Sequence, residues 1–194
     1  MTVRTPNFEP QFSIVLPCYN EIDNIVDLVV EIITHMDAIP NLAETYEVIV
    51  VDDCSNDGTS NALDKRFPPG NTPVRVIRHL ENYGQSAAIC TGIDKSRYPW
   101  IVTLDGDGQN DPADIASLIK RMQSSYAKHR HLMICGQRVK RRDTWFRRFS
   151  SKVANGVRAK LLGDATPDTG CGLKLFSKEA FLNFPRFNHM HRFL

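Results

Sequence analysis

Short apolar runs alternate along the chain with longer segments in which apolar residues recur every three or four positions. The short runs are rich in β-branched and aromatic residues, as is typical of buried strands. We predict strands at residues 12–16, 46–51, 74–78, 100–104, 132–136 and 173–176. Because these strands alternate with helical segments, the pattern predicts an α/β fold with a mostly parallel sheet flanked by helices.

The helical segments are marked by apolar spacing and by terminal residues. Between the first two strands, an apolar stripe runs from Ile22 to Met36. Asp111 is a candidate N-cap, with Pro112 in the first turn of the helix that follows. Further helices are predicted at residues 59–66, 85–96, 112–125, 145–162 and 177–183.

Length and composition fit one globular domain, because 194 residues of which 42% are hydrophobic are enough to bury a core. No run reaches the roughly 18 consecutive apolar residues of a membrane span, and residues 1–11 lack the features of a secretory signal. The five cysteines form no CxxC pair, so we expect reduced thiols. The composition therefore predicts a soluble, cytoplasmic domain.

Charge is distributed unevenly, although the net charge is only +2. Residues 1–57 hold eleven acidic residues and one Arg, whereas residues 118–194 hold seventeen Lys or Arg and four acidic residues. The C-terminal half is expected to attract an anion or an anionic surface. A solvated basic face remains the alternative.

Polar residues gather where the predicted strands end. Residues 17–21 follow the first strand, residues 52–59 the second and residues 105–109 the fourth. Ligands of open α/β sheets bind beyond the carboxyl ends of the strands. We therefore expect these three acidic loops to converge on one crevice.

Several familiar ligand sites are excluded by the spacing. No GxGxxG follows a strand and no GxxxxGK[ST] is present, which argues against dinucleotide-binding and P-loop proteins. Residues 53–64 match part of an EF-hand calcium loop, but a strand precedes them and position 12 is Asp64, where Glu is usual. We interpret that match as accidental.

The pair Asp105 and Asp107, with Gly106 between them, suggests a divalent cation. Two carboxylates at a strand end can meet an ion that also holds a diphosphate, and oxygen ligands favour Mg²⁺ or Mn²⁺ over zinc. A turn rich in Asp and Gly is the structural alternative.

In order, PCYNE at 17–21, VVDDCSNDGT at 50–59 and DGDGQ at 105–109 resemble family 2 glycosyltransferases of the GT-A fold, within them the polyprenyl (dolichyl or undecaprenyl) phosphate sugar transferases. The resemblance runs from Phe12 to the last residue. It implies a Rossmann-like α/β fold, a UDP- or GDP-sugar donor, Mg²⁺ or Mn²⁺, and a polyprenyl phosphate acceptor at the cytoplasmic face of a membrane. Residues 1–194 would then form a single catalytic domain that lacks the C-terminal part of typical relatives.

The resemblance also implies individual roles. Base and ribose would be held by Pro17, Tyr19, Glu21, Val51 and Asp53. Ribose, metal and diphosphate would be held by Asp105, Gly106, Asp107 and Gln109, with Asp105 and Asp107 as metal ligands. The phosphates of donor and acceptor would meet Arg138, Arg147, Ser151 and Lys174, the last standing where many members carry Arg. Asp107, Arg138 and Asp168 are the residues expected to serve catalysis.

The expected reaction is an inverting, in-line displacement at the anomeric carbon. A lipid phosphate is ionised near neutral pH and needs cationic contacts more than a base, whereas a glycan hydroxyl would need a base, for which Asp168 is the candidate. A glycan-hydroxyl transferase and a non-catalytic nucleotide-sugar or membrane-surface binding module stay open as alternatives. Nucleic-acid binding is disfavoured, because no such motif is present and the N-terminal half is acidic.

Overall fold

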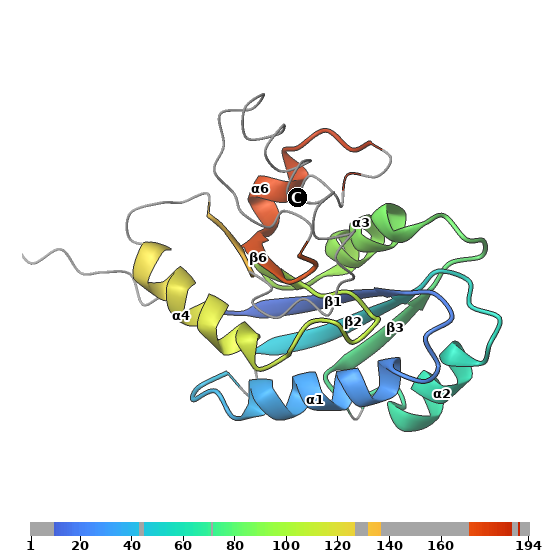
Figure 1. The fold of residues 1–194 in the computed structure, drawn as a ribbon. Coiled ribbons are helices and arrows are strands. Elements are labelled where there is room, and N and C mark those ends of the chain that lie inside the picture. Colours follow the sequence, from blue (N-terminus) through green and yellow to red (C-terminus); the bar gives the residue numbers. More distant parts are fainter. Residues whose placement is uncertain are drawn as a thin grey trace, which may run out of the picture.

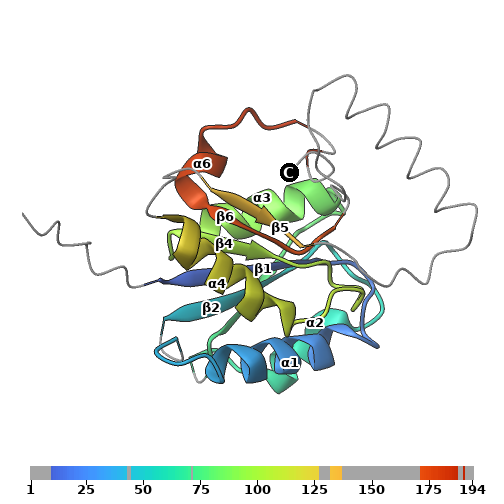
Figure 2. The same ribbon diagram turned by 60° about the vertical axis from the view of Figure 1, so that its left-hand side comes forward.

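Parallel strands form most of a six-stranded sheet in the order β3-β2-β1-β4-β6-β5 (Figures 1 and 2). The computed structural model describes residues 10–42, 45–70, 72–126, 132–136, 171–187 and 190. The strands are β1 (Phe12–Cys18), β2 (Tyr46–Asp52), β3 (Val74–Arg78), β4 (Trp100–Thr103), β5 (Met133–Cys135) and β6 (Lys174–Ser177). The mostly parallel sheet predicted from the sequence is confirmed, and β6 is the antiparallel strand, paired with both β4 and β5.

Helices cover both faces of the sheet, which is why every residue of β1 and β2 is buried. The helices are α1 (Ile25–Asp37), α2 (Thr59–Arg66), α3 (Gln85–Lys95), α4 (Asp114–Tyr126) and α6 (Lys178–Leu182). Apolar residues of α1, α2 and α4 share one core cluster with alternate residues of β1, and those of α3 and α6 pack on the opposite face (Figure 1). The alternation of β1 between two cores is the period-2 geometry of a strand.

The stripe predicted for the first helix is confirmed in its main part and wrong at its start. Ile25, Leu28, Val29, Ile32 and Met36 are buried, but Ile22 is exposed and precedes the helix. The backbone N–H of Ile25 donates to the carbonyl of Glu21 at 2.9 Å, which begins the helix three residues later than the apolar spacing suggests. The predicted helix at 145–162 lies outside the described residues. Within the described ranges, no helix has both the length and the apolar content of a membrane span.

The antiparallel orientation of β6 matters for the site. Thr103, at the carboxyl end of β4, pairs with Lys174, at the beginning of β6. The hydroxyl of Thr103 also donates to the carbonyl of Gly172 at 2.9 Å. Residues 171–173 therefore reach the same edge of the sheet as the loop that follows β4.

The C-terminal described segment is anchored on α3. Arg186 donates to both carboxylate oxygens of Asp94 at 2.6 Å, and this bidentate pair raises the pKa of the guanidinium. Met190 is buried and contacts Cys90 on the same helix. The position of α3 is thus fixed by the sheet on one side and by this segment on the other.

A glycine permits α3 to lie close to the sheet. A Cβ added at Gly92 would overlap Val15 of β1 and lie 3.2 Å from Cγ2 of Val51 in β2. Glycine is unfavourable inside a helix, so its presence here is explained by the short distance between the helix and the sheet.

Replacing Gly92 by Ala is expected to destabilise the fold, although alanine usually stabilises a helix relative to glycine. The added methyl group would overpack against Val15, so we expect the free energy of unfolding to fall by about 1–3 kcal/mol. Urea unfolding measures this change, with Ser117→Ala on an exposed position of α4 as the control. A Gly92→Ala protein as stable as the wild type would contradict the close packing of α3 on β1.

Candidate functional site

A pocket of about 260 Å³ lies at the carboxyl edge of the parallel strands. It is lined by the loops after β1, β2 and β4 and by the first turn of α3. The lining residues are Pro17, Cys18, Tyr19, Glu21, Asp53, Gln85, Ala88, Asp105, Gly106 and Asp107. The structure thus brings together the acidic loops that the sequence predicted to converge.

The loops after β1 and β2 interlock through hydrogen bonds. The backbone N–H of Asn20 donates to the Ser55 hydroxyl at 2.9 Å, and the N–H of Asn56 donates to Oδ1 of Asn20 at 2.9 Å. The N–H of Glu21 donates to the Thr59 hydroxyl at 3.1 Å. Asn20 has a φ of 55°, a left-handed conformation that Asn tolerates better than most residues. The first loop is therefore held against the second by both side chains and backbone.

Two acidic residues near this interlock are structural. Asp57 accepts from the backbone of Thr59 at 2.9 Å and from the N–H of Ile22 at 3.1 Å, and these bonds lower its carboxyl pKa despite the opposing effect of desolvation. Asp52 accepts from the N–H of Ser55 at 2.9 Å and from the Ser60 hydroxyl. Both carboxylates therefore hold the loop after β2 and the start of α2 in place. Asp64 pairs with Arg78 instead of facing Asp53, which agrees with an accidental EF-hand match.

Asp53 is a buried carboxylate at the end of β2. Its Oδ1 accepts from Nδ1 of His79 at 2.6 Å and from the N–H of Tyr83 at 3.0 Å. Its Oδ2 accepts from the N–H of Gly84 at 2.6 Å. The loop between β3 and α3 therefore wraps around this side chain, and the backbone donors stabilise its charge.

The Asp105-Gly106-Asp107 turn closes the opposite side of the pocket. A Cβ at Gly106 would lie 2.8 Å from the carbonyl oxygen of Pro17, so only glycine allows this turn to approach the loop after β1. Asp105 accepts from Nε2 of Gln85 at 2.6 Å, while the exposed Asp107 accepts from the N–H of Gln109 at 3.0 Å. The two carboxylates stand on the pocket wall and offer the oxygen ligands that Mg²⁺ and Mn²⁺ prefer.

Gly172 supports Asp105 from the segment that precedes β6. A Cβ added at Gly172 would overlap the carboxylate of Asp105. This contact could not be predicted from the sequence, because it depends on β6 running antiparallel beside β4. Gln85, Cys18 and Ala88 were not predicted as site residues either, although Gln85 is the polar first residue of the helix predicted next after the third strand.

The carboxylates give the pocket a negative electrostatic potential, and the pKa of the Cys18 thiol on its wall is shifted accordingly. Burial raises the pKa of the Cys18 thiol strongly, and the charges of Asp52, Glu21, Asp57 and Asp53 raise it further. A cation entering the pocket would relieve the repulsion among these carboxylates.

Some predicted residues lie elsewhere. Val51 is fully buried in β2, Gln109 is exposed beyond the turn, and Lys174 is 4% exposed inside β6, so none of the three is part of the described lining. Arg138, Arg147, Ser151 and Asp168 lie outside the described residues. The roles assigned to these seven positions stay predictions.

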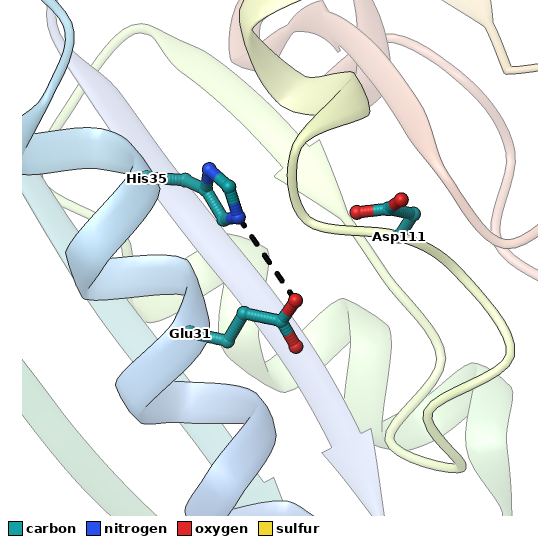
Figure 3. Close-up of side chains that lie close together, drawn as sticks. All are labelled: Glu31, His35 and Asp111. Atoms are coloured by element: carbon teal, nitrogen blue, oxygen red, sulfur yellow. Dashed lines mark ion pairs between the residues drawn. The ribbon is translucent and has the colours of Figure 1, made fainter.

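A second acidic group lies apart from the pocket. Oxygen or nitrogen atoms of Glu31, His35 and Asp111 lie within 4.8 Å of one another, and Nε2 of His35 is 3.9 Å from Glu31 (Figure 3). Asp111 accepts from the N–H of Ala113 at 2.9 Å in the turn before α4, and α4 itself begins at Asp114 and not at residue 112 as predicted, so the N-cap prediction for Asp111 is wrong. An i,i+4 pair and a turn-forming aspartate account for this group without an ion.

Comparisons with known proteins agree with this geometry. The model of the family described as glycosyl transferase family 2 matches residues 13–183. Dodecaprenyl-phosphate galacturonate synthase of Rhizobium johnstonii is 33% identical over 186 residues, which cover 95% of this chain and 53% of that protein. Undecaprenyl-phosphate 4-deoxy-4-formamido-L-arabinose transferase of Edwardsiella ictaluri is 33% identical over 165 residues, or 84% of this chain and 48% of that protein. The chain thus spans about half the length of these relatives.

Solved structures show the same fold. A mannosyltransferase from Pyrobaculum calidifontis, in complex with GDP-Man and Mn²⁺, superposes with a TM-score of 0.61 at 20% identity and covers 93% of this chain and 49% of its own. Mannosyl-3-phosphoglycerate synthase from Rubrobacter xylanophilus gives a TM-score of 0.65 at 17% identity, over 89% of this chain and 54% of its own. The predicted GT-A fold is thereby confirmed.

The protected environment of Cys18 leads to a chemical prediction. Iodoacetamide at about pH 8 is expected to alkylate the exposed Cys54 and to leave Cys18 unmodified, because Cys18 is buried and its raised pKa keeps the thiol protonated. Peptide mass spectrometry measures both sites, and concentrated guanidinium chloride provides the unfolded control. Equal rates in the folded protein would contradict the buried position of Cys18.

Gly172→Ala is expected to weaken Mn²⁺ binding about tenfold, because the new methyl group would displace the Asp105 carboxylate. Titration of Mn²⁺ followed by electron paramagnetic resonance measures the affinity. Gly136→Ala is the matched control, since its methyl group would meet Leu173 and Cys171 rather than the pocket. Unchanged Mn²⁺ affinity in Gly172→Ala would count against Asp105 as a ligand.

Proposed function

The chain belongs to glycosyl transferase family 2, and from this premise we propose that its pocket binds a nucleotide-sugar and that the sugar is transferred to a polyprenyl phosphate. The observation that carries the proposal is the convergence of Tyr19, Glu21, Asp53 and the Asp105-Gly106-Asp107 turn on one pocket. Two relatives whose names specify sugar transfer to a polyprenyl phosphate support the acceptor class.

The donor site follows from the chemistry of the lining. Tyr19 is 45% exposed at the pocket and offers an aromatic face for a base. Glu21 and Asp53 are acceptors for hydroxyl or N–H groups of a nucleoside. Asp105 and Asp107 face the same pocket, so the diphosphate would lie between them and the positive residues expected from the C-terminal half.

Asp105 and Asp107 would hold Mg²⁺ or Mn²⁺. The fit rests on their oxygen atoms, on the electronegative pocket and on the support of Asp105 by Gln85 and Gly172. When bound, the ion would neutralise charge on the leaving nucleoside diphosphate.

The chain's own residues would position donor and acceptor for an inverting displacement. An oxygen of the lipid phosphate attacks the anomeric carbon, the bond from that carbon to the diphosphate oxygen breaks, and the nucleoside diphosphate leaves. Arg138, Arg147 and Ser151 are the residues proposed to bind phosphates, whereas Lys174 is buried inside β6. A lipid acceptor would bring the protein to the cytoplasmic face of a membrane. Asp168 would act as a base only with a hydroxyl acceptor.

Nucleotide binding is expected to raise the melting temperature of the protein in the presence of Mn²⁺. At a ligand concentration of about 100 times the dissociation constant, a gain of about 2.7 kcal/mol corresponds to roughly 5–10 °C. Asp107→Asn is expected to remove the Mn²⁺-dependent part, because the neutral amide is a poorer ligand. Thermal unfolding with UDP-sugars and GDP-sugars measures both effects.

Glu31→Gln is the matched control, because it changes the second acidic group and leaves the pocket intact. Transfer of labelled sugar to undecaprenyl phosphate, compared with a glycan acceptor, then tests the acceptor class. A cooperative melt that no nucleotide shifts would overturn the proposed donor site.

A further inference from the structure

The hydrogen bonds that Asp53 already accepts leave few acceptor positions on its carboxylate for a ligand. A carboxylate has about two acceptor positions on each oxygen. On Oδ1, His79 Nδ1 at 2.6 Å and the Tyr83 N–H at 3.0 Å fill both. On Oδ2, the Gly84 N–H at 2.6 Å fills one, and no other described residue donates to this oxygen. One acceptor position on Oδ2 therefore remains for a ligand in the pocket that Asp53 lines.

His79 is itself held from several sides. Its backbone N–H donates to the carbonyl of Asp52 at 2.9 Å, which extends the pairing of β2 and β3 by one residue. Its Nε2 lies 2.9 Å from the hydroxyl of Thr91 on α3, and its ring packs edge-on against Tyr83 at 5.3 Å between centroids. The side chain is only 9% exposed. A histidine fixed in this way holds the Asp53 carboxylate in one orientation, and its Nδ1 carries the hydrogen, since an ionised carboxylate only accepts.

We propose that His79 is a positioning residue that makes the donor pocket selective for uracil over guanine. Uracil presents one N–H, at N3, between two carbonyl groups, and this single donor matches the single acceptor position on Oδ2. Guanine presents N1–H and the N2 amino group side by side, and this pair requires both carboxylate oxygens. Because His79 and Tyr83 occupy Oδ1, one guanine donor would be left without a partner, which is costly in a buried site.

The inference rests on the proposed function, since it assumes that the base of a nucleotide-sugar reaches Asp53. It also predicts the behaviour of cytosine. N3 of cytosine is an acceptor and would face the carboxylate with no hydrogen between them, so CDP is expected to bind as poorly as GDP. If the pocket excluded bases by size, it would reject guanine and accept cytosine. Weak binding of both GDP and CDP would therefore indicate that hydrogen-bond matching at Asp53 determines the selectivity.

The experiment is a calorimetric titration of UDP, GDP and CDP, with Mn²⁺, into the wild type and into variants of His79. We expect wild type to bind UDP at least about tenfold more tightly than GDP or CDP. His79→Phe keeps an aromatic ring but removes the Nδ1 donor, and it is expected to bring the UDP to GDP affinity ratio close to one. His79→Asn places an amide N–H near the position of Nδ1 and is expected to restore most of the selectivity.

His35→Phe is the matched control, because His35 lies on α1 outside the pocket, and it is expected to leave the ratio unchanged. A wild type that binds GDP or CDP as tightly as UDP overturns the inference while the proposed function stands. A folded His79→Phe protein that keeps the wild-type UDP to GDP affinity ratio also overturns the inference, because His79 would then have only a structural role. If wild type binds none of the three nucleotides, the proposed function itself is overturned.

Discussion

Carboxylates of like charge crowd one end of this sheet, and the architecture around the pocket is the means by which they are held there. Parallel strands deliver Glu21, Asp53, Asp105 and Asp107 to one edge, where their mutual repulsion opposes folding. Each neighbouring element supplies a compensating donor: the loop before α3 bonds Asp53, the first residue of α3 bonds Asp105, and the turn after β4 bonds Asp107. The site is therefore stable because its acids are partly neutralised by backbone and amide dipoles, while acceptor capacity remains for a ligand.

Features that depend on local sequence could be predicted, and features that depend on strand register or direction could not. The continuous apolar runs located the strands, and three motifs at strand ends located the acidic loops. Ile22 was wrongly included in the first helix, because its spacing from the next apolar residues fits the helical stripe. In the structure, residue 22 still belongs to the turn that follows Glu21, and α1 begins at Ile25. No local pattern indicates that β6 runs antiparallel, so the support of Asp105 by Gly172 could not be foreseen. His79 was missed for a similar reason, since its partners Asp53 and Thr91 come from β2 and α3.

The acids of the β2 loop divide into two kinds, although the sequence presents them as one motif. Asp52 and Asp57 accept hydrogen bonds from residues of the loops after β1 and β2 and of the first turn of α2, and these bonds shape the backbone. Asp53, which stands between them, turns to the pocket and receives its donors from a different segment. A motif rich in Asp thus combines one ligand-facing residue with neighbours that serve only to hold the loop.

The interlock between the loops after β1 and β2 also constrains how this sequence can change through evolution. Asn20 both receives a hydrogen bond from Asn56 and donates its own N–H to Ser55, with a backbone conformation that few residues adopt. A replacement at Asn20 would remove the acceptor of the Asn56 N–H, whereas a replacement at Asn56 would keep this bond, because Asn56 donates through its backbone. Position 20 is therefore expected to tolerate few residues among relatives, while position 56, which lies 36 residues further along the chain, is less restricted.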